Sequence, residues 1–361
     1  MEKIIRIEDA ELPNNDHFDM IDVFRFICSI MIMMVHINPF SYSKSPSVIS
    51  YIDSFVNDLV STIAVPFFFV TSGFLLFKKT TPNNLDAGYI LRYLKRILRL
   101  CIIWTIIYFP LEVIVGGESF SIFMYLKNLI LTGSLHIWYL NALIFSVAVI
   151  SIMLYKKIKP GTILKASFIF HAVAILSKSW YGLLRPIQEL NPAVWEKILT
   201  VSRFIGSAKN GLLFGFFYVS MGMFFAYKKI IIDKKKSVVM LLTSSFLMLV
   251  EFVVTTYFDI AKGHDISLFM IPVTFFVFHL VKESKFKFKK KNDLGSLSAL
   301  MYFTHFWLGK MYRTIFADLP NSTSKSTMIF LLSLVTTILL SETIILLSKK
   351  EKFRFLTYLY K

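Results

Sequence analysis

The sequence predicts an all-α polytopic membrane protein, a bundle of about ten transmembrane helices with both termini in the cytoplasm. Hydrophobic residues make up 55% of the chain, the mean hydropathy is +0.62, and 37 of the 361 residues are phenylalanine. A soluble core of this size cannot bury so many apolar side chains. They also fall into separate runs of about 20 residues, the length that crosses a bilayer as a helix. We therefore expect a multi-pass protein of the cell membrane.

The apolar runs, taken in order, locate the spans. They cover residues 19–40, 55–77, 98–115, 136–155, 162–178, 209–227, 238–258, 266–281, 296–313 and 326–348. Acidic residues such as Glu8 and Asp9 precede the first run, unlike the basic start of a cleaved signal peptide, so we expect a permanent first helix. The predicted organisation is a cytoplasmic segment (1–18), a membrane domain (19–348) and a basic cytoplasmic tail (349–361).

Alternate loops are basic, and this pattern orients the spans. Lysine and arginine gather after every second span, at residues 78–99, 156–159, 228–236, 282–291 and 349–350. The intervening loops contain little lysine, apart from residues 179–208. Because basic loops remain in the cytoplasm, both termini are predicted there. Basic loops beside an anionic leaflet also explain the formal charge of +17, so no nucleic-acid partner is expected.

The sequence offers few other sources of chemistry. Its two cysteines, Cys28 and Cys101, lie in apolar stretches, so we expect neither a disulfide framework nor a metal cluster. We find no internal repeat, Walker loop, dinucleotide fingerprint or soluble domain. Any reaction must therefore be performed by the helical bundle itself.

Arg25 and His36 form a polar stripe on the first span. They lie eleven residues apart in an otherwise apolar stretch. Eleven helical steps return to nearly the same azimuth and rise about 16 Å along one face. An arginine inside a membrane segment costs a few kcal/mol, so such a residue normally faces a polar interior and marks a pathway or a site. Asp22, one turn before Arg25, can pair with it and reduce that cost.

Further motifs follow in a definite order along the chain. They are the aromatic-Ser-Gly stretch at 65–74, Arg-x-x-Arg at 96–99, His136-Ile137-Trp138-Tyr139-Leu140, Lys209-Asn210-Gly211, Glu251, and Tyr302-Phe303-Thr304-His305. Together with the Arg25 and His36 spacing, this order resembles the acyltransferase-3 family of integral membrane acyltransferases over nearly the whole chain. The resemblance implies an O-acetyltransferase-like enzyme that uses acetyl-coenzyme A as its acyl donor and no metal.

Two departures from the family pattern concern the acceptor. Val65-Pro66 stands where many members have an aspartate, and Lys209 stands where the related arginine would be. Both features resemble a branch that includes the membrane domains fused to vancomycin-type serine racemases, for which amino-acid transport has been proposed. The alternative function is therefore a transporter or flippase for a small polar substrate, such as an amino acid or a glycan intermediate.

The resemblance assigns donor-binding roles near the cytoplasmic side. Arg92, Arg96 and Arg99 repeat at steps of four and three, so a short helix would show all three on one face. Their guanidinium groups suit the phosphates of coenzyme A, although they could also only fix the topology. Arg25 either holds an anionic part of the donor or forms a structural ion pair with Asp22. Ser72 is a further donor-binding candidate, and packing beside Gly73 is its simpler role.

The resemblance places the reaction at the outer side. His36 is the expected general base, deprotonating a hydroxyl that attacks the thioester. Glu251 is the second catalytic candidate, because an intramembrane carboxylate could orient His36 or bind the acceptor. The candidate acceptor-binding residues are His136, Trp138, Lys209, Asn210, Tyr302 and His305. The expected partners are an envelope polysaccharide or another hydroxyl acceptor, and membrane lipids.

A long outer loop, residues 179–208, separates the fifth and sixth spans. It carries aromatic and basic residues, including Trp180, Trp195 and Arg203. These suit a lid or a glycan-binding ledge, and an interfacial helix on the outer leaflet would explain them equally well.

Overall fold

The computed structural model of the protein describes residues 5–9, 18–41, 53–117, 120–123, 125, 129, 135–205, 207–288 and 293–361. The main helices are α1 (Asp19–Ile37), α3 (Ala64–Phe77), α4 (Ala87–Gly116), α6 (Trp138–Tyr155), α7 (Pro160–Ser177), α8 (Arg185–Leu190), α9 (Pro192–Ile205), α10 (Phe216–Tyr227), α11 (Lys234–Tyr257), α12 (Met270–Lys282), α13 (Leu294–Ile315) and α14 (Thr323–Ser348). Shorter helical turns are η1 (Phe55–Val60), η2 (Ser61–Ile63), η4 (Leu135–Ile137), η5 (Tyr181–Leu184), η6 (Gly211–Gly215) and η7 (Glu351–Leu359), and the strands are β1 (Arg6–Asp9) and β2 (Lys228–Ile231).

The fold is a polytopic helical bundle, as the sequence predicts. Seven of the described helical segments are long and apolar enough to cross a membrane, and the apolar segments Gly211–Tyr227 and Met270–Lys282 are shorter. Every predicted span contains a helix. The protein is therefore a multi-pass membrane protein, while the number of spans and the side of the termini remain predictions.

One local expectation is corrected by the structure. The arginines at 92–99 do not lie on a separate short helix, because α4 runs without a break from Ala87 to Gly116. Its early start is fixed by Asp86, whose side chain accepts a hydrogen bond from the backbone N–H of Tyr89. Pro66 lies in the first turn of α3, which directly follows the irregular turns η1 and η2.

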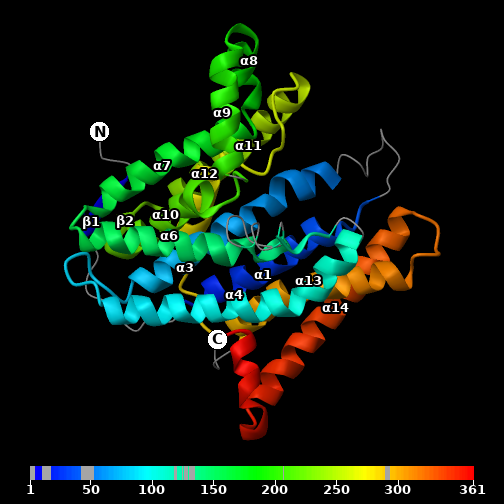
Figure 1. Ribbon diagram of the computed structural model, residues 1–361. Coiled ribbons are helices and arrows are strands. Elements are labelled where there is room, and N and C mark those ends of the chain that lie inside the picture. The colour runs from blue at the N-terminus through cyan, green and yellow to red at the C-terminus, as the bar shows by residue number, and fades with distance from the viewer. Residues whose placement is uncertain are drawn as a thin grey trace.

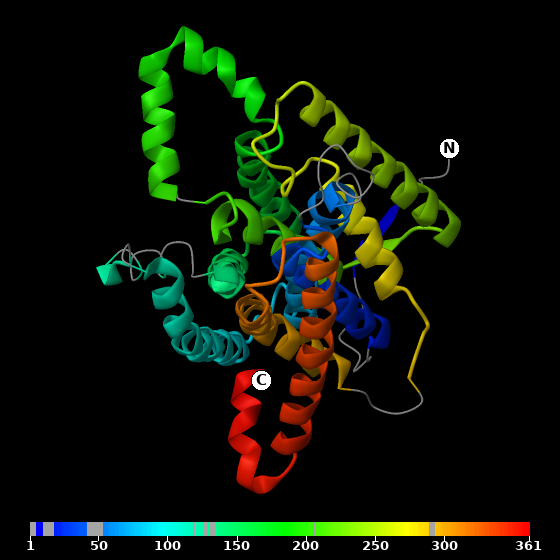
Figure 2. The same ribbon diagram turned by 90° about the vertical axis from the view of Figure 1, so that its right-hand side faces the viewer.

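Helix α1 lies among α3, α12, α13 and α14. Helices α1, α3, α4 and α6 run roughly side by side in Figure 1, where α14 is inclined to them, and Figure 2 shows the bundle turned by 90°. In the middle of α1, the hydroxyl oxygens of Ser29 and Ser298 lie 2.7 Å apart, and they lie 3.0 and 2.9 Å from the carbonyl oxygen of Arg25, within hydrogen-bond distance. These bonds join α1 to α13 beside the predicted polar stripe.

Glycines let α3 and α10 approach closely. A Cβ atom added to Gly73 would lie 2.4 Å from the carbonyl oxygen of Val219, and one added to Gly222 would lie 2.1 Å from that of Val70. Neither position can hold a larger residue without moving a backbone. Gly73 of the aromatic-Ser-Gly stretch thus permits close helix contact with α10.

The basic loops gather at one end of the bundle, which we call the basic end. There Lys78 lies over the ring of Phe18, and Lys157 donates to the carbonyl oxygen of Asn83. Strand β1 pairs with β2, which places Glu8 opposite Lys229. This common location follows the alternation of charge in the sequence.

The other end of the bundle, the far end, carries the end of α1 and the long loops. Residues 179–208 form η5, α8 and α9, an arm that projects from the bundle on the side opposite to the α14–η7 hairpin (Figure 1). The side chain of Arg203 lies outside the described residues. The arm is tied to the α11–α12 loop, since Gly182 donates from its backbone N–H to the carbonyl oxygen of Ile260.

Candidate active site

Three histidines from three separate segments meet at the far end of α1. The ring centroid of His36, on α1, lies 5.3 Å from that of His305, on α13, and 6.1 Å from that of His136, on η4. The rings of His136 and His305 are 5.1 Å apart, and both residues are buried. We call these three residues the histidine cluster. It unites the predicted base with two of the predicted acceptor-binding residues.

Several ring nitrogens of the cluster have no protein partner. Among the described residues, Nδ1 and Nε2 of His136 and Nε2 of His305 are buried without a hydrogen bond. Nδ1 of His305 lies 3.0 Å from the carbonyl oxygen of Met301, and we assign the proton of this ring to that nitrogen. Because buried polar atoms are nearly always paired, these nitrogens indicate a place where a bound molecule or water belongs.

Arg313 fixes the end of α1 beside the cluster. Its guanidinium group donates to the carbonyl oxygens of His36 and Ile37, at 3.3 and 2.8 Å. On the same helix, a Cβ atom added to Gly309 would lie 3.0 Å from the side chain of Ile37, so α13 packs tightly on this turn. The charges of Arg313 and Lys209 both act on the His36 ring. The histidine is thus held in a positively charged environment.

A series of contacts leads from the cluster toward the basic end. The Tyr302 hydroxyl donates to the carbonyl oxygen of His136, and its ring lies 5.7 Å from that of Tyr139. The Tyr139 hydroxyl lies 2.9 Å from Oγ of Ser72. Ser72, the predicted donor-binding serine, is therefore connected to the cluster through two tyrosines.

The series continues from Ser72 to the arginines of α4. Ser72 also lies near the side chain of Tyr93, and the Arg96 guanidinium lies over the Tyr93 ring, 5.0 Å from its centroid. We call Arg96, Tyr93, Ser72, Tyr139 and Tyr302 the polar line. It joins an arginine of the Arg-x-x-Arg motif to the histidine cluster across the bundle.

Arg25 lies beside the polar line. It forms an ion pair with Asp22, with 3.0 Å between the nitrogen and the oxygen, and both side chains are largely buried. A Cβ atom added to Gly295 would lie 2.8 Å from the Asp22 carboxylate and 2.9 Å from the Arg25 guanidinium, so α13 closes directly over the pair. The charge of Arg25 also acts on Tyr93 and Tyr139. Arg25 thus has both the expected ion pair and a position near the predicted donor route.

The three arginines of α4 have different partners. Arg92 lies 3.8 Å from the Asp86 carboxylate, with both side chains mostly exposed. Arg96 faces Tyr93 and the polar line. Arg99 lies over the ring of Tyr358, 4.4 Å from its centroid. Only Arg96 is connected by described contacts to the polar line, although all three lie on exposed parts of one helix.

Glu251 is buried, and its carboxylate binds loops at the far end. It accepts hydrogen bonds from Nε1 of Trp180 at 2.7 Å and from the backbone N–H groups of Leu268 and Phe269 at 2.8 and 3.0 Å. No described contact joins Glu251 to His36 or to the rest of the cluster. Its bonds connect the start of the long outer arm to the start of α12.

Lys209 and Asn210 have distinct local roles. The Asn210 side chain accepts a hydrogen bond from the backbone N–H of Leu213 at 2.8 Å and so caps η6. Gly211 follows because a Cβ atom there would lie 2.6 Å from Phe145. Lys209 forms an ion pair with Asp265 at 2.6 Å. The Lys-Asn-Gly motif thus shapes the chain beside the far end and supplies one charge near His36.

The Lys209 ion pair affects the titration of Asp265. Partial burial tends to raise the pKa of this carboxyl, but the charge and hydrogen bond of Lys209, together with the charge of Lys178, hold it below its ordinary value. Asp265 is therefore ionised at neutral pH and connects the α11–α12 loop to the segment before η6.

Trp138 lies near His136 in the motif, but its described ring contacts are not with the histidine cluster. Its ring lies 6.1 Å from Phe69 and 6.2 Å from Phe214. Residues that sequence reasoning did not select complete the walls of the cluster: Tyr108 lies 4.8 Å from His136, and Phe306 lies 5.7 Å from His36. Phe306 adjoins His305 in sequence, but no spacing rule connects Tyr108 to either motif.

Within the described parts of the chain, no group of three or more His, Cys, Asp or Glu side chains is placed to hold a metal ion. The histidine cluster is therefore not such a group.

The fold and the site together define a multi-pass membrane protein with a polar interior. In this interior the polar line leads from Arg96 to the histidine cluster. The chain belongs to the acyltransferase-3 family, whose acyltransferase domain matches residues 18–345. The match contains the histidine cluster and the polar line. The family resemblance noted in the sequence is thereby confirmed.

The curated relatives of the chain are longer proteins. Two amino-acid racemases of Enterococcus faecalis are 25% identical over 296 residues and 26% identical over 344 residues, covering 80% and 92% of this chain but 38% and 46% of the relatives. A serine/alanine racemase of Enterococcus gallinarum is 25% identical over 293 residues, covering 79% of this chain and 40% of the relative. The chain thus spans about two fifths of their length. No solved structure matches it.

Proposed function

We propose that the protein transfers an acetyl group from acetyl-coenzyme A, bound at the basic end, to a hydroxyl group of an envelope polysaccharide or related glycan at the far end. The observation that carries this proposal is the polar line, which joins Arg96 to the histidine cluster. The acyltransferase family supports the type of reaction. The basic end would face the cytoplasm of a cell-membrane protein.

In this mechanism His36 acts as the general base. An unprotonated ring nitrogen of His36 takes the proton of the acceptor hydroxyl while the hydroxyl oxygen bonds to the thioester carbonyl carbon. The carbon–sulfur bond then breaks, and the coenzyme A thiolate takes the proton from the His36 imidazolium. His136 has ring nitrogens without a described protein partner, and we assign one N–H of this ring to the developing charge on the carbonyl oxygen.

The donor would enter from the basic end. Arg25 and Arg96 would bind its phosphates or other polar groups, with Arg92 and Arg99 in more peripheral positions. A pantetheine arm is comparable in length to the rise of about 16 Å between Arg25 and His36 on α1. Tyr139 and Tyr302 fill part of the interior between these ends, so the arm must pass beside their rings or displace them. Ser72 lies on this route as a hydrogen-bonding group rather than as a nucleophile.

The acceptor would approach at the far end. Lys209 provides a positive charge near His36, and Tyr302 and His305 form part of the wall of the cluster. Asn210 and Trp138 would act by shaping the adjoining η6 and α6, since their described contacts are with Leu213, Phe69 and Phe214. We assign Glu251 a positioning role, because its carboxylate holds the loops that border this entrance.

A transfer assay tests the proposal. Purified protein is supplied with acetyl-coenzyme A labelled in the acetyl group, and both release of coenzyme A and labelled acceptor are measured with glycan fractions from the envelope. We expect coenzyme A release to depend on the acceptor and on His36. A variant with His171→Gln is the matched control, since His171 is buried and stacked on Phe217 at 4.8 Å, with Nδ1 placed 3.0 Å from the Leu213 carbonyl oxygen.

The names of the relatives favour one second candidate. All three are described as amino-acid racemases or a serine/alanine racemase. The same polar interior could conduct an amino acid across the membrane, with Arg25 and His36 lining the path. Vesicles with the purified protein reconstituted in their membrane distinguish the two functions. Protein-dependent uptake of serine or alanine, with no transfer from any acyl-coenzyme A, would replace the acyltransferase proposal by transport.

A further inference from the structure

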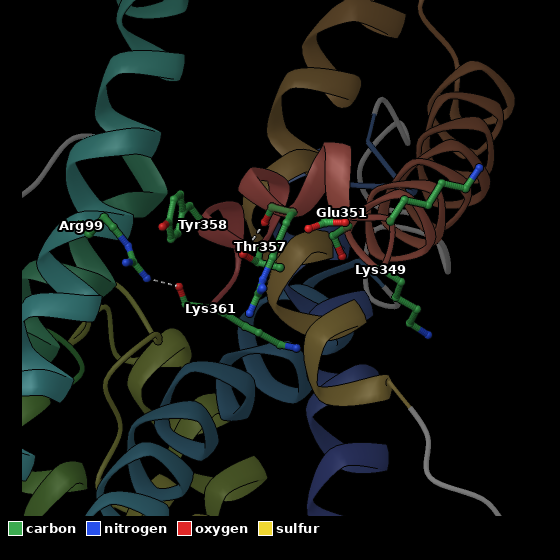
Figure 3. A pocket seen from close by; sticks show the side chains of 9 residues that line it. Arg99, Lys349, Glu351, Thr357, Tyr358 and Lys361 are labelled. Atoms are coloured by element: carbon green, nitrogen blue, oxygen red, sulfur yellow. Dashed lines mark hydrogen bonds between the residues drawn. The ribbon is translucent and has the colours of Figure 1, made fainter.

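A basic pocket lies outside the polar line, at the basic end of the protein. It has a volume of about 630 Å³ and is formed by Arg99 of α4, the end of α14, and η7 with the residues that flank it. In Figure 3 a dashed line marks the hydrogen bond from Arg99 to the main-chain oxygen of Lys361 in the lining of this pocket. Nearly all of its lining follows residue 345, where the match to the acyltransferase domain ends. The pocket is therefore not explained by the family resemblance.

The pocket is strongly positive. Its lining includes Arg99, Lys349, Lys350, Arg354 and Lys361, and its one acidic lining residue is Glu351. Lys349 is engaged elsewhere, since its ammonium group lies 2.7 Å from the Asp293 carboxylate and this contact raises its pKa. Among the described residues, no ion pair is found for Lys350, Arg354 or Lys361. At least three cations thus lack a neutralising partner within the described structure.

The walls of the pocket are held by bonds to the bundle. Arg99 donates to the backbone carbonyl oxygen of Lys361 and stacks on Tyr358. Trp104, one turn further along α4, donates from Nε1 to the carbonyl oxygen of Leu359 at 2.9 Å. On the α14 side, the hydroxyl oxygens of Ser348 and Tyr360 lie 2.8 Å apart. These contacts fix the segment after α14 against two membrane helices, so the cations are gathered before any ligand binds.

We propose that this pocket binds a phosphate-bearing anion. Two guanidinium groups and nearby ammonium groups match the several acceptor oxygens and the negative charge of a phosphate. The Thr357 and Tyr358 hydroxyls lie in the same lining. The volume is large enough for a phosphate together with its substituent. This inference does not depend on the proposed reaction, because a transporter could contain the same site.

Two sources of phosphate fit this position. The first is an anionic phospholipid headgroup: Leu346 and Phe355, on the two elements that bound the pocket, are 62% and 61% exposed, as expected of side chains that face acyl chains. The second is a soluble phosphate compound such as coenzyme A, which would approach from the same side. The chemistry of recognition is shared, so the test must separate the sources.

The test uses the full chain, purified in detergent and freed of phospholipid. Coenzyme A and short-chain phosphatidylglycerol are titrated separately, with phosphatidylcholine as a zwitterionic comparison, and binding is measured by calorimetry and native mass spectrometry. The variant Lys350→Gln with Arg354→Gln should weaken binding of the recognised anion by about tenfold or more. The matched control is Lys285→Gln with Lys352→Gln, which removes the same charge from basic-end residues outside the pocket lining.

The two titrations identify the source. Preferential binding of phosphatidylglycerol, lost in the pocket variant only, assigns the site to a lipid headgroup, whereas preferential binding of coenzyme A with the same loss assigns it to a soluble phosphate. Glu351→Gln should tighten binding in either case, because it removes the one acidic side chain of the lining. The proposal is overturned if neither anion binds, or if the pocket variant and the control lose affinity equally.

Discussion

The rings of His36 and His305 face one another across the contact between α1 and α13, with 5.3 Å between their centroids. Each helix contributes a second contact at the same level, since Arg313 of α13 donates to the carbonyl oxygens of His36 and Ile37. The position of the proposed base is therefore set by the packing of two helices rather than by a loop. Substitutions in this contact can therefore distinguish a loss of catalytic activity from a loss of folding.

His36→Ala should reduce transfer by about 10²-fold or more, because it removes the proposed proton acceptor. The protein should still insert and accumulate, since the carbonyl oxygen that Arg313 binds belongs to the backbone and is retained. Turnover is measured on purified protein and normalised to its amount. Retention of more than about a tenth of wild-type turnover would exclude His36 as the base.

Arg96→Gln should raise the Michaelis constant for acetyl-coenzyme A by about tenfold, because Arg96 is the one arginine of the three that belongs to the polar line. Arg92→Gln is the control, since Arg92 is mostly exposed and lies near Asp86. Added salt should weaken donor binding in the wild type. If Arg96→Gln combined with Arg99→Gln leaves the constant unchanged, these two arginines do not bind the donor.

Gly222→Ala should destabilise the bundle by about 1–3 kcal/mol or more, because the new Cβ atom would meet a backbone oxygen at 2.1 Å. Gly161→Ala provides the control: it also lies in a helix, but its Cβ atom would have no neighbour within 4 Å. Thermal unfolding in detergent measures both. Equal melting temperatures for the two variants would show that α3 and α10 can separate without cost.

Asp265→Asn should remove about 0.5–1 kcal/mol at neutral pH, because both partners of its ion pair with Lys209 are partly exposed. The folded-state pKa of Asp265 is below its ordinary value of 3.8, so the stabilisation is complete above that value and is lost as the pH falls through the folded-state pKa. The loss of stability on acidification should therefore be smaller in the variant. Asp318→Asn, at an exposed position, should leave the pH dependence unchanged.

Cysteines introduced at Asn83 and Asp318 should react from opposite sides of the membrane, because these exposed positions lie at the basic end and in the α13–α14 connection at the far end. The background lacks the buried Cys28 and Cys101. Sealed vesicles are treated with a membrane-impermeant thiol reagent before and after lysis. Labelling of both sites from one side would overturn the assigned orientation of the bundle.

The first span and the shared end of the basic loops could be predicted because both depend on local patterns. Helical periodicity relates Arg25 to His36, and alternating charge identifies the loops that lie together. The meeting of His36, His136 and His305 could not be derived in this way, since it depends on how three segments distant in sequence pack. Ordered motifs indicated the residues, but not their contacts.

Other features had no sequence signal of sufficient strength. Glu251 is a buried carboxylate by its sequence context, yet its role depends on N–H groups of Leu268 and Phe269 that no side-chain pattern reveals. The residues after α14 could be recognised as basic, but a charge run does not show whether it is solvated or folded against a helix. Trp104 binds the Leu359 carbonyl oxygen and Ser348 binds the Tyr360 hydroxyl, so this segment is folded against the helices.

Because α1 is a single unbroken helix from Asp19 to Ile37, the distance between Arg25 and His36 is fixed. Their separation is set by the helical rise and is independent of bilayer thickness, loop length or the motion of the outer arm. One residue inserted between them would turn His36 by about 100° away from His305 while adding only about 1.5 Å. The register of this helix, more than its length, therefore decides whether His36 stays in the histidine cluster.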